Sequence, residues 1–377
     1  MILSEEQQML RDAVRQYTRE QIAPNAAAWD RDGTFPQQAL KGLAAMGLYG
    51  IAIAEEWGGA GMDHTALALA LEEIAAGDGA TSTIVQVNNL AAGILAGYAT
   101  PAQKERYLKP LARGDLLGAF ALTEPHTGSD ASAIRTRAEP VDGGYLLHGV
   151  KQFVTSGKHA DIAIVFAVTD KSAGKKGISA FVVPTATPGY IVARIEEKAG
   201  QHASDTAQIL FEGCRVPAEN LLGHAGEGYR IALSNLESGR INVAAQSVGM
   251  ARSALDAALA YARERTTFGK PLLEHQAVNF RLADMATGVE AARQLYLHAA
   301  SLRDRGLPCL KEASMAKLFA SEAAEKICSD AIQIHGGYGY VRDFPVERIW
   351  RDVRVTQIYE GASDIQRMVI GRALAGG

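Results

Sequence analysis

The chain has 377 residues, of which 47 % are hydrophobic and 21 % are charged, and its formal net charge is −4. This composition excludes an intrinsically disordered chain, and the absence of any Lys/Arg run gives no indication of nucleic-acid binding. The length predicts two or three compact domains. Three widely spaced cysteines without a CxxC pair favour a reducing compartment over a disulfide or zinc scaffold.

The first residues carry no basic stretch before an apolar run, so we expect no secretory signal. No apolar run reaches the ~18 residues that suggest a membrane span. We therefore expect a cytoplasmic protein without membrane contact.

Residues 1–117 predict an N-terminal α-helical domain. Ser4 and Gln7 form a capping-box pattern at its start, and apolar residues then follow at helical spacing. Gly-rich breaks separate three further Ala- and Leu-rich segments, which predict helices at 36–47, 64–76 and 84–97.

Residues 118–226 predict a middle β domain, because short β-branched and aromatic runs alternate there with turn residues. The predicted strands are Leu117–Leu122, Tyr145–Thr155, Ile162–Thr169, Ile178–Val183 and Gln208–Phe211. A hairpin is indicated at Asp142-Gly143-Gly144, and the loop Lys171–Gly177 joins another pair. This spacing favours an antiparallel, barrel-like sheet.

From residue 227 the helical period returns. Apolar residues recur seven apart from Ile241 to Ala262, and at +3/+4 spacing from Leu282 to Ala299. Two helices of about 35–40 Å are expected, within a C-terminal helical bundle at 227–377.

Several common sites are absent. The chain lacks G-x-G-x-x-G, the P-loop pattern, a serine flanked by Gly at −2 and +2, and H-E-x-x-H. A Rossmann NAD site, a P-loop, a hydrolase nucleophile elbow and a metal site are therefore not predicted.

Five less general segments remain, and each has a structural alternative. Phe120–Asp130 follows a strand and offers hydroxyls and amides to a planar ring, or is a capped turn. Lys151–Gly157 places Phe153 and Thr155 on one face of a strand, or is a plain amphipathic strand. Arg263–Lys270 ends a helix and binds an anion, or only complements the helix dipole.

The other two segments lie near the C-terminus. Gln333–Gly339 brings bare Gly backbone near a phosphate or adenine, or is an ordinary helix C-cap. Tyr359–Arg367 places Glu360 just before a new helix. In an apolar cleft its pKa would rise and it would serve as a general base; the alternative is an acid favoured by the helix dipole.

In this order, across an α–β–α layout, the five segments resemble the acyl-CoA dehydrogenase family from about residue 4 to 373. The T-E-P-x-x-G-S-D loop and the Y-E-G-x-S-D-I-Q-R segment are the most specific. The resemblance implies an N-terminal helical domain, a β-barrel-like middle domain and a C-terminal four-helix bundle, with FAD between the last two.

The resemblance also implies which residues contact FAD. Those that would hold the isoalloxazine ring are Phe120, Leu122, Thr123, Gly128, Ser129, Phe153 and Thr155. Ala362 and Asp364, which follow the base, match positions that touch the cofactor. Those that would reach the adenine and pyrophosphate of a neighbouring subunit's FAD are Arg265, Phe268, His275, Gln276, Gln333, Gly336 and Gly337. The family suggests a homotetramer built as a dimer of dimers.

By the same resemblance, Glu360 removes the pro-R α-proton of an acyl-CoA thioester while the β-hydrogen leaves as hydride to the flavin. Electrons then pass to an electron-transferring flavoprotein. The residues expected along the CoA and acyl path are Ser129, Glu237, Arg240, Tyr359 and Gly361. Two positions depart from the family pattern: Phe153 stands where many members have Trp, and Ala362 where Thr is usual.

Gly239 cannot supply a base in the position that some branches use, and residues 81–103 contain no Lys or Arg for a second carboxylate. We therefore expect a short or short-branched acyl chain rather than a glutaryl group. The alternatives are an O₂-using flavoprotein and a non-catalytic protein of the same fold. Glu360 and the compact length disfavour the first, and the weakly charged C-terminus disfavours a DNA-binding role.

Overall fold

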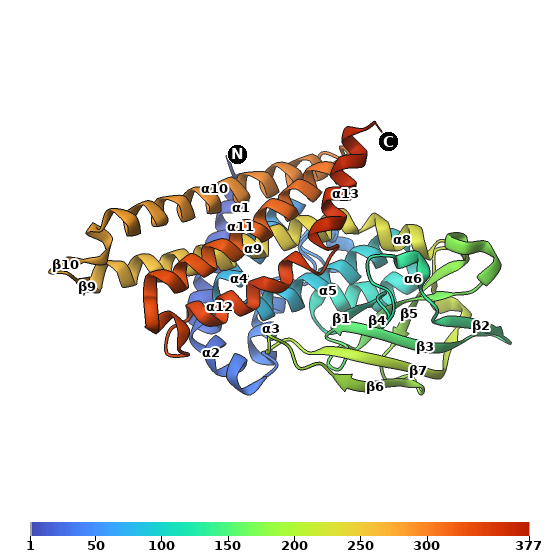
Figure 1. Cartoon of the computed structure of the whole chain (residues 1–377). Helices are drawn as coiled ribbons and strands as arrows, with labels where there is room; N and C mark the ends of the chain where they lie inside the picture. Colours follow the sequence, from blue (N-terminus) through green and yellow to red (C-terminus); the bar gives the residue numbers. More distant parts are fainter. Residues whose placement is uncertain (1, 377) are drawn as a thin grey trace.

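Helices from both ends of the chain pack side by side, and the sheet formed by its middle lies at one end of them (Figure 1). The computed structural model describes residues 2–376. Ser4 caps the start of helix α1: its hydroxyl accepts a hydrogen bond from the Gln7 backbone N–H at 3.1 Å, and the Gln7 side-chain oxygen accepts one from the Ser4 backbone N–H at 3.0 Å. The predicted capping box is therefore confirmed. The N-terminal helices are α1 (Glu5–Tyr17), α2 (Ala23–Asp32), α3 (Gln37–Ala45), α4 (His64–Gly77), α5 (Gly79–Tyr98), α6 (Pro101–Gln103) and α7 (Lys109–Arg113).

One twisted sheet follows. Its strands are β1 (Gly118–Ala121), β2 (Arg137–Val141), β3 (Gly144–Thr155), β4 (Ile162–Val168), β5 (Ile178–Pro184), β6 (Tyr190–Ile195), β7 (Thr206–Pro217) and β8 (Leu221–Leu222). They are ordered β6-β7-β3-β2-β4-β5-β8, with β1 on β4. The hairpin turn predicted at Asp142-Gly143-Gly144 is confirmed and joins β2 to β3, because Val141 pairs with Gly144 around a loop in which Gly143 has φ 71°.

Two pairings depart from the expected antiparallel arrangement. Strand β1 runs parallel to β4 over four residues, and β2 meets β4 in parallel at Arg137 and Val168. Parallel neighbours need a long connection, and the β2–β3 hairpin lies within the connection between β1 and β4. Strands β2, β6 and β8 were not predicted: β2 carries Pro140 and charges, every residue of β6 is at least partly exposed at the sheet edge, and β8 has only two residues.

The C-terminal helices are α8 (Gly228–Ser234), α9 (Leu236–Glu264), α10 (Gln276–Asp304), α11 (Leu310–His335), α12 (Val346–Val353) and α13 (Ser363–Leu374). The two predicted long helices are α9 and α10. Their apolar faces share one core with α11, and α4 adds Ala68 and Leu69 to it. The helices therefore pack as one body across the sequence boundary between N- and C-terminal regions.

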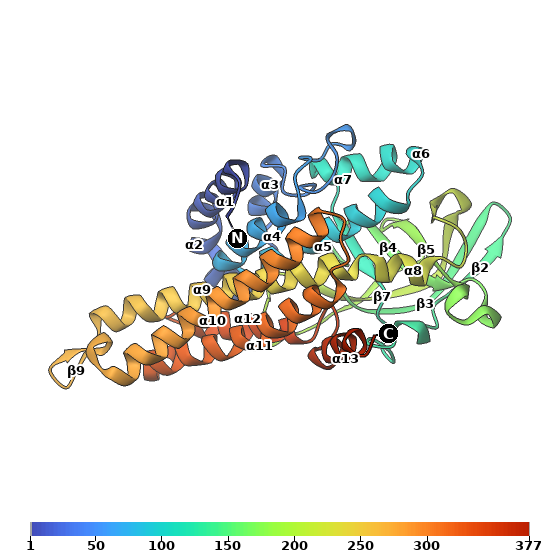
Figure 2. The same ribbon diagram turned by 90° about the horizontal axis from the view of Figure 1, so that it is seen from above.

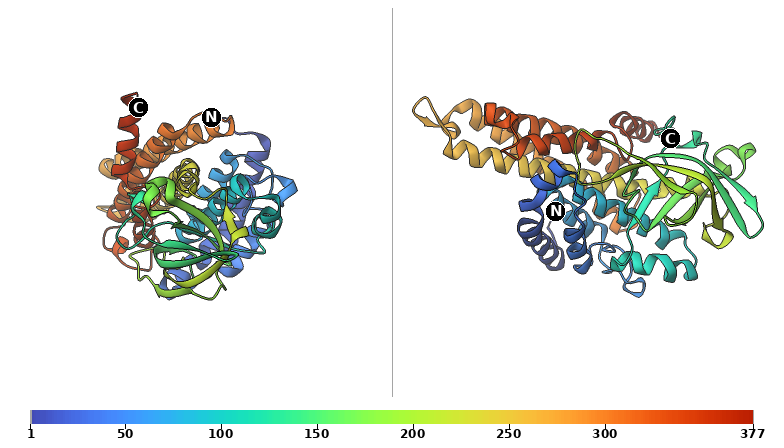
Figure 3. Two further views of the ribbon diagram at one scale, coloured as in Figure 1. Left: turned by 90° about the vertical axis from the view of Figure 1, so that its right-hand side faces the viewer. Right: turned by 90° about the horizontal axis from the view of Figure 1, so that it is seen from below.

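The molecule has two distinct ends. Helix α9 has 29 residues, or about 43 Å of helix axis. The small hairpin of β9 (Thr266–Thr267) and β10 (Lys270–Pro271) lies beyond its far end, while α8, before its start, packs on the β domain (Figures 2 and 3). Within residues 2–376, no helix is both long and apolar enough to cross a membrane. The domain boundaries drawn at 117/118 and 226/227 stay predictions.

Candidate active site

A buried ion pair joins the two segments of the β domain that were predicted to hold the flavin. The Lys151 Nζ lies 2.8 Å from a Glu124 carboxylate oxygen and also donates to the Leu122 carbonyl at 2.9 Å. The Gln152 backbone N–H donates to the Thr123 backbone carbonyl at 2.8 Å. The T-E-P loop is therefore fastened to the end of β3 by three bonds.

Both members of this pair are buried. Burial lowers the pKa of Lys151 to about 8, although Glu124 opposes the shift. Burial acts to raise the pKa of Glu124, but Lys151 and the amides of Arg135 and Thr136 outweigh it and hold that pKa below its usual range. The pair is therefore ionised at neutral pH, and each charge depends on the other.

Phe153 is the most unusual residue of this segment. Its ring is 62 % exposed and its backbone is left-handed at φ 58°, within an irregularity in the β3–β7 pairing between Lys151 and Val154. Val154 is buried and Thr155 is partly exposed, and the bulge breaks the regular alternation of the strand at Phe153, so a shared face for Phe153 and Thr155 stays a prediction. The bulge presents an aromatic ring to the outside, at a cost in backbone strain that a packed strand would avoid.

Glu360 lies in a tight loop between α12 and α13, and its backbone is also left-handed, at φ 53°. Two buried side chains hold this loop. Lys317 Nζ donates to the Gly361 backbone carbonyl at 2.8 Å. The Gln366 side-chain amide donates to the same carbonyl at 2.7 Å and to the Glu360 backbone carbonyl at 3.2 Å.

The Glu360 carboxylate faces the start of α9. A Cβ added at Gly239 would lie 2.6 Å from Glu360 Oε2, so only glycine leaves room for the carboxylate there. Burial raises the pKa of Glu360, while the charges of Arg240 and Lys317 act to lower it. A carboxylate enclosed in this way, on a residue that is itself only partly buried, has the properties of a general base.

The other predicted substrate residues surround this loop or lie on the β domain. The Tyr359 hydroxyl donates to Gln246 at 2.9 Å, and burial raises the pKa of Tyr359 to about 12. Glu237, one helical turn before Arg240, pairs with Arg303 at 3.2 Å. Ser129 lies exposed in the loop after β1.

The residues predicted to reach the adenine end of FAD lie at the far end of the bundle. Arg265 follows the last residue of α9 and lies over the Tyr338 ring at 5.9 Å. The His275 Nε2 lies 3.1 Å from the Thr267 carbonyl oxygen, and the Phe268 side chain is 97 % exposed. Gln333 lies in the last turn of α11, Gly336 and Gly337 follow that helix directly, and Gln276 begins α10 at the same end of the bundle. The structure thus gathers these residues together, but away from Glu360.

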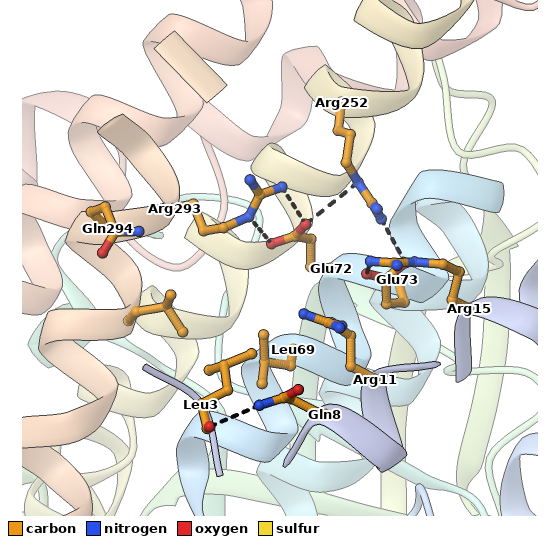
Figure 4. A pocket seen from close by; sticks show the side chains of 11 residues that line it. Leu3, Gln8, Arg11, Arg15, Leu69, Glu72, Glu73, Arg252, Arg293 and Gln294 are labelled. Atoms are coloured by element: carbon orange, nitrogen blue, oxygen red, sulfur yellow. Dashed lines mark hydrogen bonds and ion pairs between the residues drawn. The ribbon is translucent and has the colours of Figure 1, made fainter. Parts of the chain in front are cut away.

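A cleft of about 480 Å³ lies between α1, α4, α9 and α10 (Figure 4). Its charges are paired: Arg293 with Glu72 at 2.7 Å, both Arg15 and Arg252 with Glu73 at 2.8 and 2.7 Å, and Arg11 with the neighbouring Asp12 at 2.9 Å. Along α9, Arg252 is about 20 Å from Gly239. This cleft is therefore separate from the Glu360 site.

Family models match nearly the whole chain: the acyl-CoA dehydrogenase N-terminal domain at residues 4–115, the middle domain at 119–214 and the C-terminal domain at 226–375. The chain is 48 % identical to an acyl-CoA dehydrogenase of Bacillus subtilis, over 100 % of both chains. It is 45 % identical to the human mitochondrial short-chain specific acyl-CoA dehydrogenase, over 98 % of this chain and 90 % of that protein.

The solved structure of butyryl-CoA dehydrogenase from Megasphaera elsdenii superposes with a TM-score of 0.97 at 41 % identity, covering 100 % of this chain and 99 % of that chain.

The chain belongs to the acyl-CoA dehydrogenase family.

The protein is accordingly an acyl-CoA dehydrogenase, an oxidoreductase with the three-domain fold of its family. Members of this family are FAD flavoproteins. The residues present fit a flat polar cofactor, because the exposed aromatic Phe153 and the partly exposed hydroxyl residue Thr155 are only two positions apart in the chain. The buried Ser363 hydroxyl, between the predicted FAD contacts Ala362 and Asp364, has no hydrogen-bond partner among residues 2–376.

Sequence reasoning missed the residues that hold the Glu360 loop. Lys317 stands on an Ala-rich helix with Ser314 and Ser321, at spacings of three and four, and all three are buried. A polar stripe on an otherwise apolar helical face is a signal that could have indicated a role near the site. Gln366 lies within the predicted segment Tyr359–Arg367, yet nothing in its sequence position shows that its side-chain amide turns back to bind the Glu360 loop.

Proposed function

We propose that this protein catalyses FAD-dependent α,β-dehydrogenation of a short or short-branched acyl-CoA to the trans-2-enoyl-CoA, with Glu360 as the catalytic base. One observation carries the assignment. The Glu360 carboxylate stands against Gly239, facing two buried cations and accepting no hydrogen bond from a described side chain, which leaves it available to take a proton.

In this proposal Glu360 takes the α-proton, and the raised pKa of its carboxyl suits it to hold that proton. The Glu360 backbone N–H donates to the thioester oxygen and stabilises the charge that develops there. Bound FAD would accept the β-hydrogen as hydride. Tyr359 and Gly361 flank the base along the acyl path, while Ser129, Glu237 and Arg240 line the route of the CoA ester.

The cofactor would lie with its ring between the T-E-P loop and the Phe153–Thr155 segment. Arg265 and its neighbours lie at the far end of α9, about 43 Å along the helix axis from its start near Glu360. The adenine contacts would therefore come from a second copy, in the homotetramer built as a dimer of dimers that the family suggests. The reduced cofactor would pass its electrons to an electron-transferring flavoprotein.

The preference for a short chain has two supports. Two of the similar proteins are described as short-chain specific and butyryl-CoA dehydrogenases. In addition, residues 81–103 carry no Lys or Arg to pair with a second carboxylate, which disfavours a glutaryl group.

The test is anaerobic bleaching of the flavin absorbance of the purified holoenzyme by straight-chain acyl-CoAs from C4 to C16, branched short acyl-CoAs and glutaryl-CoA. We expect rapid bleaching by the C4 or short-branched substrates and little by C16 or glutaryl-CoA. Fastest bleaching by a long-chain substrate would contradict the substrate class, and a yellow protein bleached by none would contradict the proposed activity.

A further inference from the structure

We propose that Lys317 and Gln366 are positioning residues of the catalytic base: Lys317 supplies a buried positive charge toward Glu360, and both residues lock the loop that carries it. This inference rests on the proposed role of Glu360. It concerns residues of α11 and α13 that are not among the predicted site residues.

Lys317 is fully buried, which is unusual for a lysine and needs a specific reason. Its ammonium group donates to the Gly361 carbonyl, 2.8 Å away, rather than to the Glu360 carboxylate. Burial lowers the pKa of Lys317 to about 8, and Glu360 opposes that shift, so the side chain is cationic at neutral pH. The charge therefore acts on Glu360 without occupying the oxygen that must accept a proton.

Arg240 is arranged in the same way. Its Nη1 lies 3.1 Å from the Ser314 hydroxyl oxygen, on the face of α11 that also bears Lys317, and its charge too acts on Glu360. Two cations from two helices thus stabilise one carboxylate from a distance. A direct ion pair would lower the basicity of Glu360 further and compete with the substrate proton.

The backbone of the loop is locked by the same group. Glu360 and Gly361 both have positive φ, at 53° and 89°, a conformation that a non-glycine residue adopts only when its surroundings impose it. Lys317 and Gln366 impose it here, because they donate three hydrogen bonds to the two successive carbonyls. Their removal would let the base leave its place beside Gly239.

Other charges near the base are accounted for. Glu237 is paired with Arg303, and Glu322, which also acts on Lys317, is paired with Arg367 at 2.7 Å. The buried Tyr359 hydroxyl is neutral at neutral pH. Lys317 and Arg240 are therefore the cations that set the charge balance at Glu360.

The first experiment is the pH profile of kcat for the holoenzyme with butyryl-CoA and an artificial electron acceptor. Lys317→Met removes the charge, Lys317→Arg keeps it, and Gln366→Leu removes only hydrogen bonds. Lys326→Met, on the exposed face of α11, is the matched control. We expect Lys317→Met to move the acidic limb up by about one pH unit, as loss of a nearby opposite charge does. Lys317→Arg should restore the limb.

Gln366→Leu should lower kcat about tenfold or more with the limb unmoved, because it disturbs the position of the base and not its charge. Lys326→Met should match the wild type in both respects. An unmoved limb in a folded, FAD-loaded Lys317→Met would overturn the electrostatic part, and full kcat in Gln366→Leu would overturn the loop lock.

A second measurement does not depend on turnover. Isotope-edited infrared titration of the Glu360 carboxyl in the holoenzyme, identified by its loss in Glu360→Gln, gives its pKa directly in wild type and in Lys317→Met. We expect the same upward shift as in the kinetics. If the wild type oxidises no acyl-CoA, the proposed function fails, yet this titration still decides the influence of Lys317. Should Lys317→Met not retain FAD, Lys317→Gln takes its place in both measurements.

Discussion

Gly239→Ala is the substitution whose effect the structure defines most sharply. The added Cβ would stand 2.6 Å from Glu360 Oε2 and 3.0 Å from Glu360 Cδ, and real Cβ atoms essentially never come closer than 3.0 Å. The carboxylate must therefore move by about half an ångström to one ångström. A shift of about 1 Å in a reacting group costs roughly 10²-fold in rate, so we expect kcat to fall by about 10- to 100-fold.

The stability of the fold should not fall with it. Gly239 lies inside α9, where alanine is favoured over glycine by about 1 kcal/mol, and the atom it meets is the end of a side chain that can move. The assay is kcat at saturating butyryl-CoA, together with urea unfolding of the holoenzyme. The exposed Gly371→Ala in α13, where nothing lies within 4 Å of an added Cβ, is the control. Unchanged kcat in Gly239→Ala, or a loss of stability that explains the lost activity, would refute the reasoning.

Three further outcomes are expected. Lys151→Met leaves Glu124 buried without its partner and should cost about 3–5 kcal/mol in unfolding free energy with loss of bound FAD; wild-type stability in urea would contradict this. Burial raises the pKa of Asp352 from 3.8 to about 7, so the folded state binds the extra proton. The unfolding free energy therefore falls as pH rises from about 4 to 7, because over this range the folded state still holds a proton on Asp352 that the unfolded state has released. Asp352→Asn should flatten this fall in thermal stability. Co-expressed Arg265→Ala and Glu360→Gln chains should form mixed oligomers more active than either alone, whereas activity equal to that of the separate variants would contradict a shared FAD site.

Much of the fold could be predicted because local signals and tertiary structure agree. The cap at Ser4 and the β2–β3 turn at Asp142-Gly143 are short-range features that depend on a few neighbouring residues. The apolar spacing of α9 and α10 is similarly local. The parallel pairing of β1 with β4 joins strands about 40 residues apart, and no local pattern specifies it.

The site could be predicted only as far as its motifs extend. Glu360 and the T-E-P loop lie in specific segments, whereas Lys317 reaches the Gly361 carbonyl from 44 residues away. Its role depends on how α11 packs against the loop, which its own sequence does not encode. The left-handed backbone of Phe153 is another example, because it arises from a bulge against β7 rather than from any preference of phenylalanine.

The central claim is that Glu360 removes the substrate α-proton, and stopped-flow measurement of flavin bleaching by butyryl-CoA under anaerobic conditions tests it most directly. We expect wild-type holoenzyme to bleach rapidly and Glu360→Gln, with equal FAD content and an unfolding free energy at least as high, to bleach about 10²- to 10⁴-fold more slowly. Bleaching of Glu360→Gln at the wild-type rate would show that another group takes the proton and would contradict the account.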